Sequence, residues 1–400
     1  MNIAVILDTF PKLSETFIVR EILALRKAGF SVFVYALRKP ANPATDPETA
    51  ALAATARIVS DTTACQSWII CARQLVAHPV RSLAALLRIA ALLPRDFIGS
   101  LRLARALPAA VVLAHRARHD GIARVHAHFA TVPADVGLLM ARLLNVPFSF
   151  SAHARDIYVR PGAALPWKIR QATFVVACTE HGRERLLKLA PGTPSNKIVT
   201  IHHGVFPETF NAAKPEPDFV LAIGRLVPKK GFHVLVDACR ILKERGTTVQ
   251  TAIVGNGPEA DRLKEQTERF GLADRVAWLG EKTFDELSPS FQRARMLVLP
   301  SVEAPDGDRD GIANVLIEAM AQGVPVIATT ASAASEAIED GIQGFLIPPE
   351  NSVALADRME RLLRTPDLAA RMGQAGRQRV AERFDIGNNA KTLAKQFRNT

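Results

Sequence analysis

Short apolar runs alternate with helical segments along almost the whole chain, and this alternation limits the fold more than any other feature. In the first half, β-rich runs are expected at residues 3–7, 31–37, 124–127, 148–151, 174–178 and 198–201. A helix that opens at Ser14, Glu15 and Thr16 and ends at Gly29 joins the first two runs. Strand, helix and strand in that order give parallel strands, because the helix carries the chain back across the sheet. The first half is therefore predicted to be a doubly wound α/β domain.

A second alternating set follows a polar segment at 211–218, which contains two prolines and is the best linker candidate. Its apolar runs lie at 220–223, 249–254, 276–279, 296–299, 324–328 and 344–347. A chain of 400 residues also exceeds what one core usually holds. We predict two doubly wound, Rossmann-like α/β domains that face a central cleft, covering residues 1–210 and 211–385. A C-terminal helix at 386–400 is expected to return to the first domain.

Charge is divided unevenly between the two halves. Residues 1–210 contain 25 Lys and Arg against 13 Asp and Glu, whereas residues 211–400 contain 25 against 26. A basic excess confined to one half indicates a polyanionic partner, such as nucleic acid, anionic lipid or a phosphorylated acceptor. Aromatic residues make up only 6% of the chain, which argues against a nucleic-acid stacking surface.

Cysteine usage and hydropathy indicate the compartment. The four cysteines form no C-x-x-C pair, which is typical of a reducing compartment and predicts neither a zinc site nor a disulfide framework. The first apolar run has no basic segment before it, so it is interpreted as a strand rather than a signal peptide. The apolar stretch 83–93 is interrupted by Arg88 and is too short to span a bilayer. We expect a cytoplasmic protein.

The segment 310–320 carries the strongest functional signal. Glu318 follows Asp310 by eight residues, a little over two helical turns, so both carboxylates are predicted to face one side of a helix. Such a pair can accept hydrogen bonds from sugar and ribose hydroxyls. Gly311 and Ala313 would leave the amides of the helix N-terminus open to an anion. The alternative, a helix-dipole partner and a surface glutamate, fits poorly because Glu318 lies in an apolar run.

A basic turn at 224–231 is the second candidate. Arg225 and Lys230 lie between the first run of the second half and an apolar helix beginning at Phe232. A planar guanidinium, an ammonium group and a helix N-terminus together suit a diphosphate. The alternative is a solvated basic turn.

A third pattern, G-N-G-P-E-A at 255–260, matches the G-x-G-x-x-A signature of dinucleotide-binding proteins. It lies in the middle of the chain, and the first strand–helix turn of the sequence contains no glycine. We therefore interpret these glycines as turn architecture rather than as an NAD site.

Together these segments resemble glycosyltransferase family 4, a retaining family with the GT-B fold. The resemblance covers nearly the whole chain. It rests on I-G-R-L-V-P-K-K-G-F (223–232), V-G-N-G-P-E (254–259), V-L-P-S (298–301), D-G-I-A-N-V-L-I-E-A-M-A-Q-G-V-P-V-I-A-T (310–329) and E-D-G-I-Q-G-F-L-I-P-P (339–349). In the first half, F-P-K-L-S-E-T-F-I (10–18), V-H-A-H-F-A (125–130) and S-A-H-A-R-D-I-Y (151–158) resemble the branch that builds exopolysaccharides of the colanic-acid kind.

The resemblance implies a hexosyltransferase that uses a nucleotide diphosphate sugar, needs no metal or other cofactor and retains the sugar's configuration. Residues 211–385 would bind the donor, with Arg225 and Lys230 on the diphosphate and Glu318 on the ribose. His153 would lie near the reacting centre. The transferred sugar would be held by Asp310, which stands where the family has glutamate, and by the segment Gly311, Ile312, Ala313 and Asn314.

Residues 1–210 would bind the acceptor, a glycan expected to be carried on polyprenyl pyrophosphate. Ser14, Glu15, His126 and His128 are the acceptor-side candidates. The two histidines alternate along one strand and could also form part of a metal pair, but the sequence offers no third ligand, so a structural or acceptor-lining role is favoured. Arginines interleaved with apolar residues at 68–113 suggest a peripheral contact with the inner face of the plasma membrane.

Two other functions share parts of this pattern. A GT-B sugar-nucleotide epimerase would have the same fold and donor site but would need no acceptor. A non-catalytic sugar-nucleotide-binding protein would have lost its site, whereas Arg225, Lys230, Asp310 and Glu318 are all present.

Overall fold

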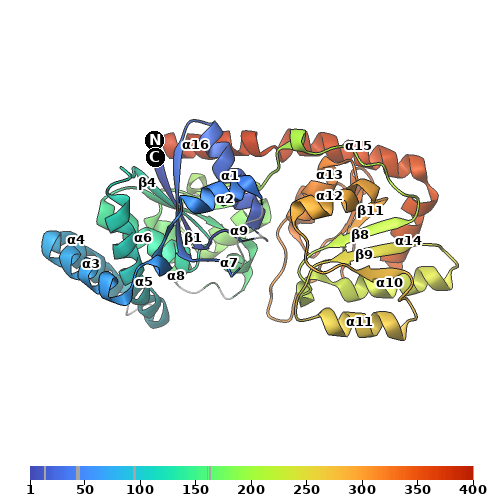
Figure 1. The fold of residues 1–400 in the computed structure, drawn as a ribbon, viewed down its shortest axis with the longest axis horizontal. Helices are drawn as coiled ribbons and strands as arrows, with labels where there is room; N and C mark the ends of the chain where they lie inside the picture. Colours follow the sequence, from blue (N-terminus) through green and yellow to red (C-terminus); the bar gives the residue numbers. More distant parts are fainter. Residues whose placement is uncertain (13–14, 42–45, 93–95, 160, 162–163, 400) are drawn as a thin grey trace. The chain divides into compact units, whose positions relative to one another are not determined.

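In the computed structural model the chain forms two compact units (Figure 1). Unit 1 comprises Met1–His202 and Gly387–Thr400, and unit 2 comprises His203–Ile386. The structure describes residues 1–12, 15–41, 46–92, 96–159, 161 and 164–399.

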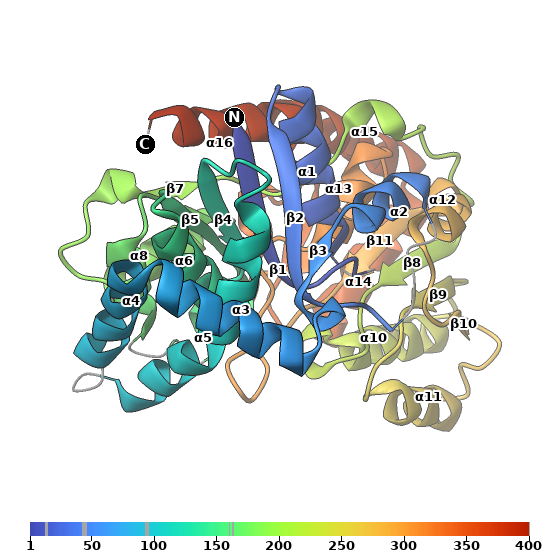
Figure 2. The ribbon, with the colours of Figure 1, turned by 60° about the vertical axis from the view of Figure 1, so that its left-hand side comes forward.

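Unit 1 is built on a seven-stranded sheet in the order β3-β2-β1-β4-β5-β6-β7, in which every pair is parallel (Figure 2). The strands are β1 (Asn2–Thr9), β2 (Ser31–Arg38), β3 (Arg57–Ile58), β4 (Arg124–His128), β5 (Phe148–Ala152), β6 (Val175–Ala177) and β7 (Ile198–Thr200). The helices are α1 (Thr16–Lys27), α2 (Pro47–Ala54), α3 (Ala64–Ala77), α4 (Pro79–Leu92), α5 (Phe97–Ala117), α6 (Val132–Leu144), α7 (Ala154–Tyr158), α8 (Ala164–Gln171), α9 (Glu180–Leu189) and α16 (Ile386–Asn399).

Unit 2 is built on a six-stranded parallel sheet in the order β10-β9-β8-β11-β12-β13. The strands are β8 (Phe219–Ile223), β9 (Gln250–Val254), β10 (Val276–Trp278), β11 (Met296–Leu299), β12 (Val326–Thr329) and β13 (Gly344–Ile347). The helices are α10 (Phe232–Glu244), α11 (Ala260–Arg269), α12 (Phe284–Arg293), α13 (Asn314–Ala321), α14 (Ser352–Arg364) and α15 (Pro366–Arg383).

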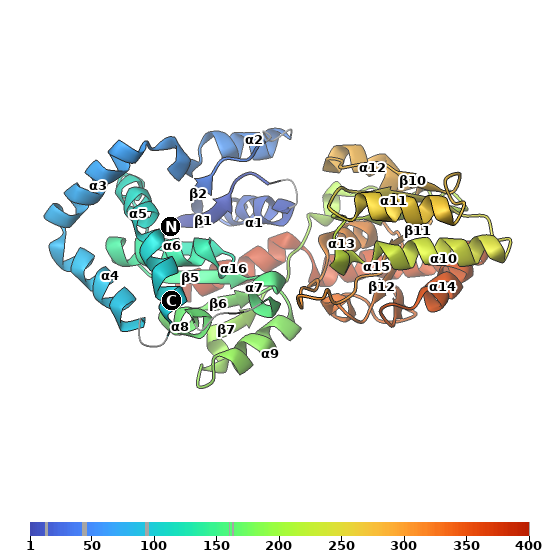
Figure 3. The ribbon, with the colours of Figure 1, turned by 90° about the horizontal axis from the view of Figure 1, so that it is seen from below.

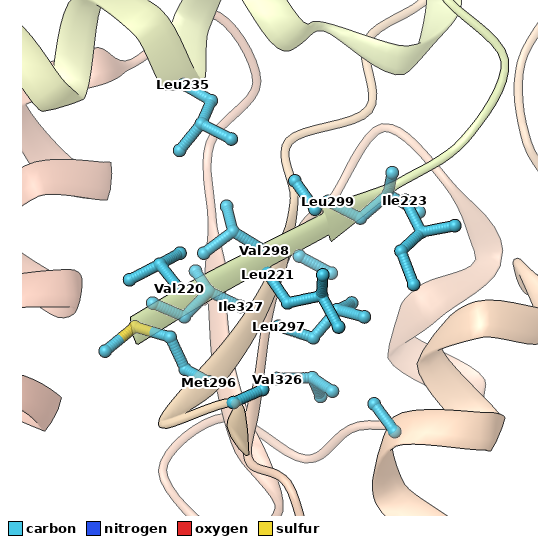
Figure 4. Packing of buried hydrophobic residues seen from close by; sticks show 14 of the residues in the cluster. Val220, Leu221, Ile223, Leu235, Met296, Leu297, Val298, Leu299, Val326 and Ile327 are labelled. Atoms are coloured by element: carbon cyan, nitrogen blue, oxygen red, sulfur yellow. The ribbon is translucent and has the colours of Figure 1, made fainter. Parts of the chain in front are cut away.

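The core of unit 2 lies around its central strands. Val220 and Leu221 on β8 pack beside Leu297 and Val298 on β11, with Ile327 on β12 (Figure 4). All five side chains are buried. A parallel sheet covered by helices on both faces needs apolar residues at every position of its strands, and that is why these runs are continuous rather than alternating.

The predicted fold class is confirmed, because each unit contains a doubly wound parallel sheet. All twelve predicted β-rich runs form strands, with ends shifted by at most two residues. The two-residue strand β3 was not predicted, since Arg57 and Ile58 are too short a run to show a pattern.

The units meet in sequence at His202 and His203, eight residues before the predicted boundary at 210/211. Val205 and Phe210 belong to the core of unit 2. The segment predicted to be a linker is attached to unit 2, where the Ala213 amide donates to the Gln322 carbonyl at 2.8 Å. Unit 2 ends at Ile386, and Gly387 is the first residue of α16 that belongs to unit 1.

The strand orders also locate the ligand-binding edges. In unit 1 the connections run in opposite directions from β1 and β4, and in unit 2 from β8 and β11. In open parallel sheets, ligands bind beyond the carboxyl ends of the two strands at such a switch point. Ligand-binding residues are therefore expected in the loops after β1, β4, β8 and β11.

Candidate functional site

The loop after β8 is held against the end of β11 by a glycine. Pro228–Lys230 form a short 3-10 turn, and Gly231 then adopts φ +64° before α10 begins. A Cβ atom on Gly231 would lie 1.9 Å from the carbonyl oxygen of Pro300, so a side chain here would clash with the backbone, and the positive φ would add strain. This close approach brings Lys229 and Lys230 beside the segment that follows β11.

Two lysines and a serine surround the carboxylate of Asp310. Lys230 Nζ lies 2.7 Å from Asp310 Oδ2, and Ser301 Oγ donates to the same oxygen at 2.8 Å. Lys229 Nζ lies 3.5 Å from Asp310 Oδ1 and 3.0 Å from Asp308 Oδ1. Lys230 and Asp310, which the sequence analysis assigned separately to the diphosphate and to the transferred sugar, are thus brought together, and sequence reasoning missed Lys229, Ser301 and Asp308.

The charge state of Asp310 follows from these contacts. Burial by itself would raise the pKa of the carboxyl group, but the ammonium groups of Lys230 and Lys229 and the hydrogen bonds from Lys230 and Ser301 outweigh burial and hold the pKa below its ordinary value. Asp310 is therefore a carboxylate at neutral pH, and it acts as the counter-ion of the two lysines.

Arg225 lies on the same loop as Lys230, and its side chain is exposed. Among the residues that the structure describes, no carboxylate forms an ion pair with it. An exposed guanidinium at the carboxyl end of β8 is available to an anion from solvent.

Helix α13 begins at Asn314, four residues after Asp310, so the predicted helical spacing of Asp310 and Glu318 is wrong. Gly311 and Ile312 are not helical, and Ala313 is the N-cap with no side-chain cap bond. Before the helix starts, Asp310 is held by Lys230 and Ser301, which lie outside α13. The first amides of α13 remain without a side-chain cap, as predicted, and Glu318 is buried in its second turn.

The G-N-G-P-E-A segment has a packing role in the structure. A Cβ on Gly255 would lie 1.9 Å from the Gly224 carbonyl oxygen, and one on Gly257 would lie 2.4 Å from that of Leu226. The Leu226 amide donates to the Asn256 carbonyl at 2.9 Å. These glycines therefore allow the loop after β9 to lie against the loop that carries Arg225, and the interpretation as turn architecture is confirmed.

Unit 1 contains a charged pocket of about 490 Å³ at its own switch point, beyond the carboxyl ends of β1 and β4. Glu15 lines it and is paired with Lys12 at 2.7 Å. Ser14, predicted beside Glu15, lies outside the described residues. The other charged residues in the lining are Asp8, Arg38, Arg102, Arg155, Asp156 and Lys168.

Buried charges support this pocket from behind. Asp135 and Lys168 are fully buried and lie 2.8 Å apart, and Arg102 Nε lies 2.6 Å from the second oxygen of Asp135. Lys168 also donates to the Ala130 carbonyl. One carboxylate thus fixes two cations at the pocket wall. Sequence reasoning missed this set, although an aspartate in the apolar run of α6 was a signal that could have revealed it.

Asp156 connects the loops on two sides of the pocket. Its Oδ2 accepts hydrogen bonds from the backbone amides of Ala130 at 2.8 Å and His153 at 3.1 Å. Burial raises the pKa of Asp156 to about 6, although the two amides and Lys168 oppose the shift. This carboxyl group therefore titrates just below neutral pH.

His153 lies at the N-terminus of α7, directly after β5, and is buried. Its ring lies 4.3 Å from that of Phe129 and 5.3 Å from that of Phe17, measured between centroids. Its Nδ1 lies 3.6 Å from Cys178 Sγ. The predicted catalytic histidine is thus at the carboxyl end of a central strand, in an aromatic setting.

His126 and His128 are buried in the unit rather than placed on the pocket wall. His126 Nδ1 and Nε2 lie 2.8 and 3.0 Å from the hydroxyls of Ser149 and Ser151. Burial and neighbouring His128 lower the pKa of His126 to about 3, so this ring is neutral. Glu21 supplies the third group that the sequence did not reveal, with its Oε1 3.1 Å from His128 Nε2. Because the serine hydroxyls occupy both nitrogens of His126, the cluster is best described as a buried hydrogen-bonded network.

Two Rossmann-like units with parallel sheets, one with a lysine–aspartate cluster at its switch point and one with a charged pocket, are the architecture of the GT-B glycosyltransferase fold. The sequence model described as "Glycosyltransferase Family 4" matches residues 14–209, and that described as "Glycosyl transferases group 1" matches residues 208–379. The chain belongs to glycosyltransferase family 4.

Several proteins of polysaccharide synthesis are similar to this chain. A putative colanic acid biosynthesis glycosyltransferase of Salmonella typhimurium is 28% identical over 398 residues, covering 96% of each chain. The Escherichia coli protein of the same name is 31% identical over 257 residues, and this match spans 63% of each chain. The amylovoran biosynthesis glycosyltransferase AmsK of Erwinia amylovora is 38% identical over 178 residues, or 44% of each chain.

Solved structures show the same fold. HepE of Anabaena, determined in complex with UDP and glucose, has a TM-score of 0.73 at 19% identity, and the match covers both chains completely. The sucrose-phosphate synthase of Thermosynechococcus elongatus has a TM-score of 0.74 at 19% identity, covering 100% of this chain and 98% of that one.

Proposed function

We propose that this enzyme is a retaining hexosyltransferase that moves a sugar from a nucleoside diphosphate to a lipid-linked glycan during exopolysaccharide synthesis. The relatives named for colanic acid and amylovoran synthesis support the pathway class. The observation that carries the proposal is the arrangement of Lys229, Lys230 and Asp310 at the switch point of unit 2, because it holds two cations where an anionic ligand is expected.

Binding of the donor changes the ion pairs of this arrangement. The diphosphate takes Lys230 from Asp310 and adds Arg225, while the uncapped amides at the start of α13 favour its negative charge. Asp310 is then released to accept hydrogen bonds from the hydroxyls of the transferred sugar. Glu318 binds the ribose.

The same groups assist the chemical step. As the bond from the sugar to the diphosphate breaks, negative charge develops on the leaving oxygen, and Lys230 and Arg225 stabilise it. The leaving diphosphate accepts the proton of the attacking acceptor hydroxyl on the face that it leaves, which retains the configuration. His153 is proposed to act near the reacting centre. This route uses no metal, so activity should survive EDTA; loss of activity that Mg²⁺ or Mn²⁺ restores would contradict it.

The acceptor is proposed to bind the charged pocket of unit 1, with its pyrophosphate beside Arg102, Arg155 and Lys168. Five of the eight charged side chains in the lining are cationic. An acceptor carried on a polyprenyl chain places the enzyme at the cytoplasmic face of the plasma membrane.

Replacement of Lys230 by alanine tests the donor site. Loss of one charge-assisted contact should weaken donor binding by about 1.5–3 kcal/mol, roughly ten- to a hundredfold in Kd. Calorimetric titration with UDP-, GDP- and ADP-sugars measures this. Lys264→Ala, an exposed lysine on α11, is the matched control and should leave Kd unchanged. An unchanged Kd and rate for Lys230→Ala would contradict the assignment of Lys230 to the donor diphosphate.

A further inference from the structure

Exposed apolar side chains are concentrated in one short stretch of unit 1. Of the described residues, sixteen large apolar side chains are exposed, and eleven of them lie between Trp68 and Leu101. Isolated exposed apolar residues are ordinary, but a cluster of this size marks an interaction surface.

The cluster covers three helices, and we call it the apolar patch. In Figure 3, α3 and α4 lie on the outer side of unit 1, beyond α5. On α4 the exposed residues Val80, Leu83 and Leu87 follow the three- and four-residue spacing of a single helix face. The remaining members are Trp68, Ile69, Leu75 and Val76 on α3, Leu86 on α4, and Phe97, Ile98 and Leu101 on α5.

The opposite faces attach the patch to the unit. On α3, Gln74 is buried and its Oε1 accepts a hydrogen bond from Arg118 at 2.6 Å. On α5, Leu103 and Ala110 are part of the core. By length and composition α5 is the one helix of the described residues that could cross a bilayer, but 50% of that window is buried in unit 1. The patch is therefore the solvent-exposed side of helices that pack against the rest of unit 1 through their other sides.

The charges around the patch indicate its partner. Residues 64–105 contain six arginines and no lysine or glutamate, with Asp96 as the one acidic residue. Arg73 and Arg105 are exposed. A second copy of the chain that docked on this patch would bring exposed arginines such as Arg73 and Arg105 toward those of its partner, whereas an anionic lipid surface complements them.

We propose that the apolar patch docks unit 1 in the plane of a bilayer that contains anionic lipid, with the apolar side chains below the headgroups. Helices of this composition bind membranes by buried apolar area and by attraction between arginine and lipid phosphate. Arg102 follows Leu101 on α5 and lines the charged pocket, so one helix carries both part of the patch and part of the proposed acceptor site. The functional meaning of the dock rests on the proposed lipid-linked acceptor, but vesicle binding is measured without it.

Co-sedimentation of the full chain with vesicles tests the dock. We expect binding to vesicles of phosphatidylcholine with phosphatidylglycerol, and little binding to phosphatidylcholine alone. Binding should fall as salt rises, because the screening length shortens from about 10 Å at 0.1 M to about 3 Å at 1 M. The emission of Trp68, which is 77% exposed, should shift to the blue on binding, and Trp68→Phe should remove the shift.

The decisive variant is Val80→Gln with Leu83→Gln and Leu87→Gln. These side chains are exposed, so the fold should be kept while vesicle affinity falls on the order of a hundredfold. The matched control is Leu279→Gln with Ile342→Gln and Val353→Gln, three exposed apolar residues of unit 2, and it should bind like the parent chain.

Three results would overturn the proposal: equal binding to both kinds of vesicle, binding to neither, or loss of binding in the control variant alone. A change in oligomeric state of the α4 variant in sedimentation velocity, with vesicle binding intact, would instead identify a contact between copies. Donor affinity distinguishes a failure of the membrane dock from a failure of the proposed function. The α4 variant should bind donor normally, and Lys230→Ala should bind vesicles normally.

Discussion

At the residue scale, Asp310 is the internal counter-ion of the two lysines to which the proposed function gives the donor diphosphate. It lies 2.7 Å from Lys230 and 3.5 Å from Lys229, and it is a carboxylate because they keep its pKa low. An internal counter-ion reduces the repulsion between the ammonium groups of Lys229, which is buried, and Lys230, which is partly buried, before the proposed donor binds. It also competes with that donor.

Asp310→Asn should therefore separate binding from turnover. The amide keeps the shape of the side chain and can accept the Ser301 hydrogen bond, but it no longer neutralises Lys230. We expect UDP or GDP to bind roughly tenfold more tightly, which corresponds to about 1.4 kcal/mol, because the carboxylate no longer competes for Lys230. Sugar transfer should fall, because the amide is a weaker acceptor for the sugar hydroxyls. Calorimetry and initial rates measure the two effects, and weaker nucleotide binding would contradict the counter-ion role.

Asp156 gives a pH-dependent prediction. Burial raises its pKa from 3.8 to about 6, so the folded state holds this proton over a pH range in which the unfolded state has lost it. The contribution to stability is therefore fully present below the unfolded pKa of 3.8 and is lost as pH rises through the folded pKa of about 6, by about 3 kcal/mol in total. Asp156→Asn removes the titration and keeps an acceptor for the Ala130 and His153 amides.

Urea unfolding of parent and Asp156→Asn at pH 4, 5, 6 and 7 checks this prediction. The variant should gain stability relative to the parent as pH rises. A constant difference across the series would show that the Asp156 carboxyl group does not titrate in this range.

At the element scale, the turn between β8 and α10 depends on Gly231. Gly231 and Gly246 have similar φ values of +64° and +70°, but a Cβ on Gly231 would lie 1.9 Å from the Pro300 carbonyl oxygen, and nothing lies within 4 Å at Gly246. Alanine at Gly246 should therefore cost only about 1 kcal/mol for its backbone conformation. Alanine at Gly231 must also move α10 or the end of β11.

We expect Gly231→Ala to destabilise the protein by several kcal/mol more than Gly246→Ala, on the order of the larger single-residue effects. It should also weaken donor binding, because the displaced turn carries Lys230. Thermal unfolding and donor titration of both variants measure this. Equal effects of the two substitutions would show that the contact with Pro300 is not tight.

Burial explains why the strands could be predicted from the sequence, and a distant ion pair accompanies the wrong prediction for the start of α13. Strands such as β8 and β11 are buried on both faces, so their sequence has to be apolar throughout and is easily found. The helix expected to join Asp310 and Glu318 starts late, at Asn314, and Asp310 before it pairs instead with Lys230, which lies 80 residues away in sequence. Local spacing contains no information about such a partner.

The pocket of unit 1 shows the same limit more strongly. Its charged residues come from the ends of β1 and β2, from the segment after β1, and from α5, α7 and α8. In sequence, Arg102 and Lys168 resemble ordinary helix-surface cations, and only the buried Asp135 makes them part of one wall. A sequence motif can identify residues that are close in the chain, and these are not.

At the scale of the whole molecule, the last helix belongs to the first domain. Phe397 on α16 is fully buried, and its ring lies 5.4 Å from His126, 5.5 Å from Phe174 and 6.1 Å from Phe30. Asn389 adds a hydrogen bond to the His202 carbonyl at 3.0 Å. Unit 1 therefore cannot complete its core until the final residues of the chain are present.

Phe397→Ala should destabilise unit 1 by about 3–5 kcal/mol, because it leaves a cavity among aromatic rings that are fixed by the sheet. The matched control is Phe97→Ala, in which the ring is 68% exposed and little stability, within about 0.5 kcal/mol, should be lost.

Hydrogen exchange locates the effect: amides of β4 and β6 should lose protection in Phe397→Ala, and those of β8 and β11 should keep it. If β8 and β11 lose protection equally, the two units unfold as one; if β4 and β6 are unaffected, α16 does not complete the core of unit 1. Retained protection in unit 2 would mean that the donor site folds independently of the helix that follows it, and nucleotide affinity of Phe397→Ala should then equal that of the parent enzyme.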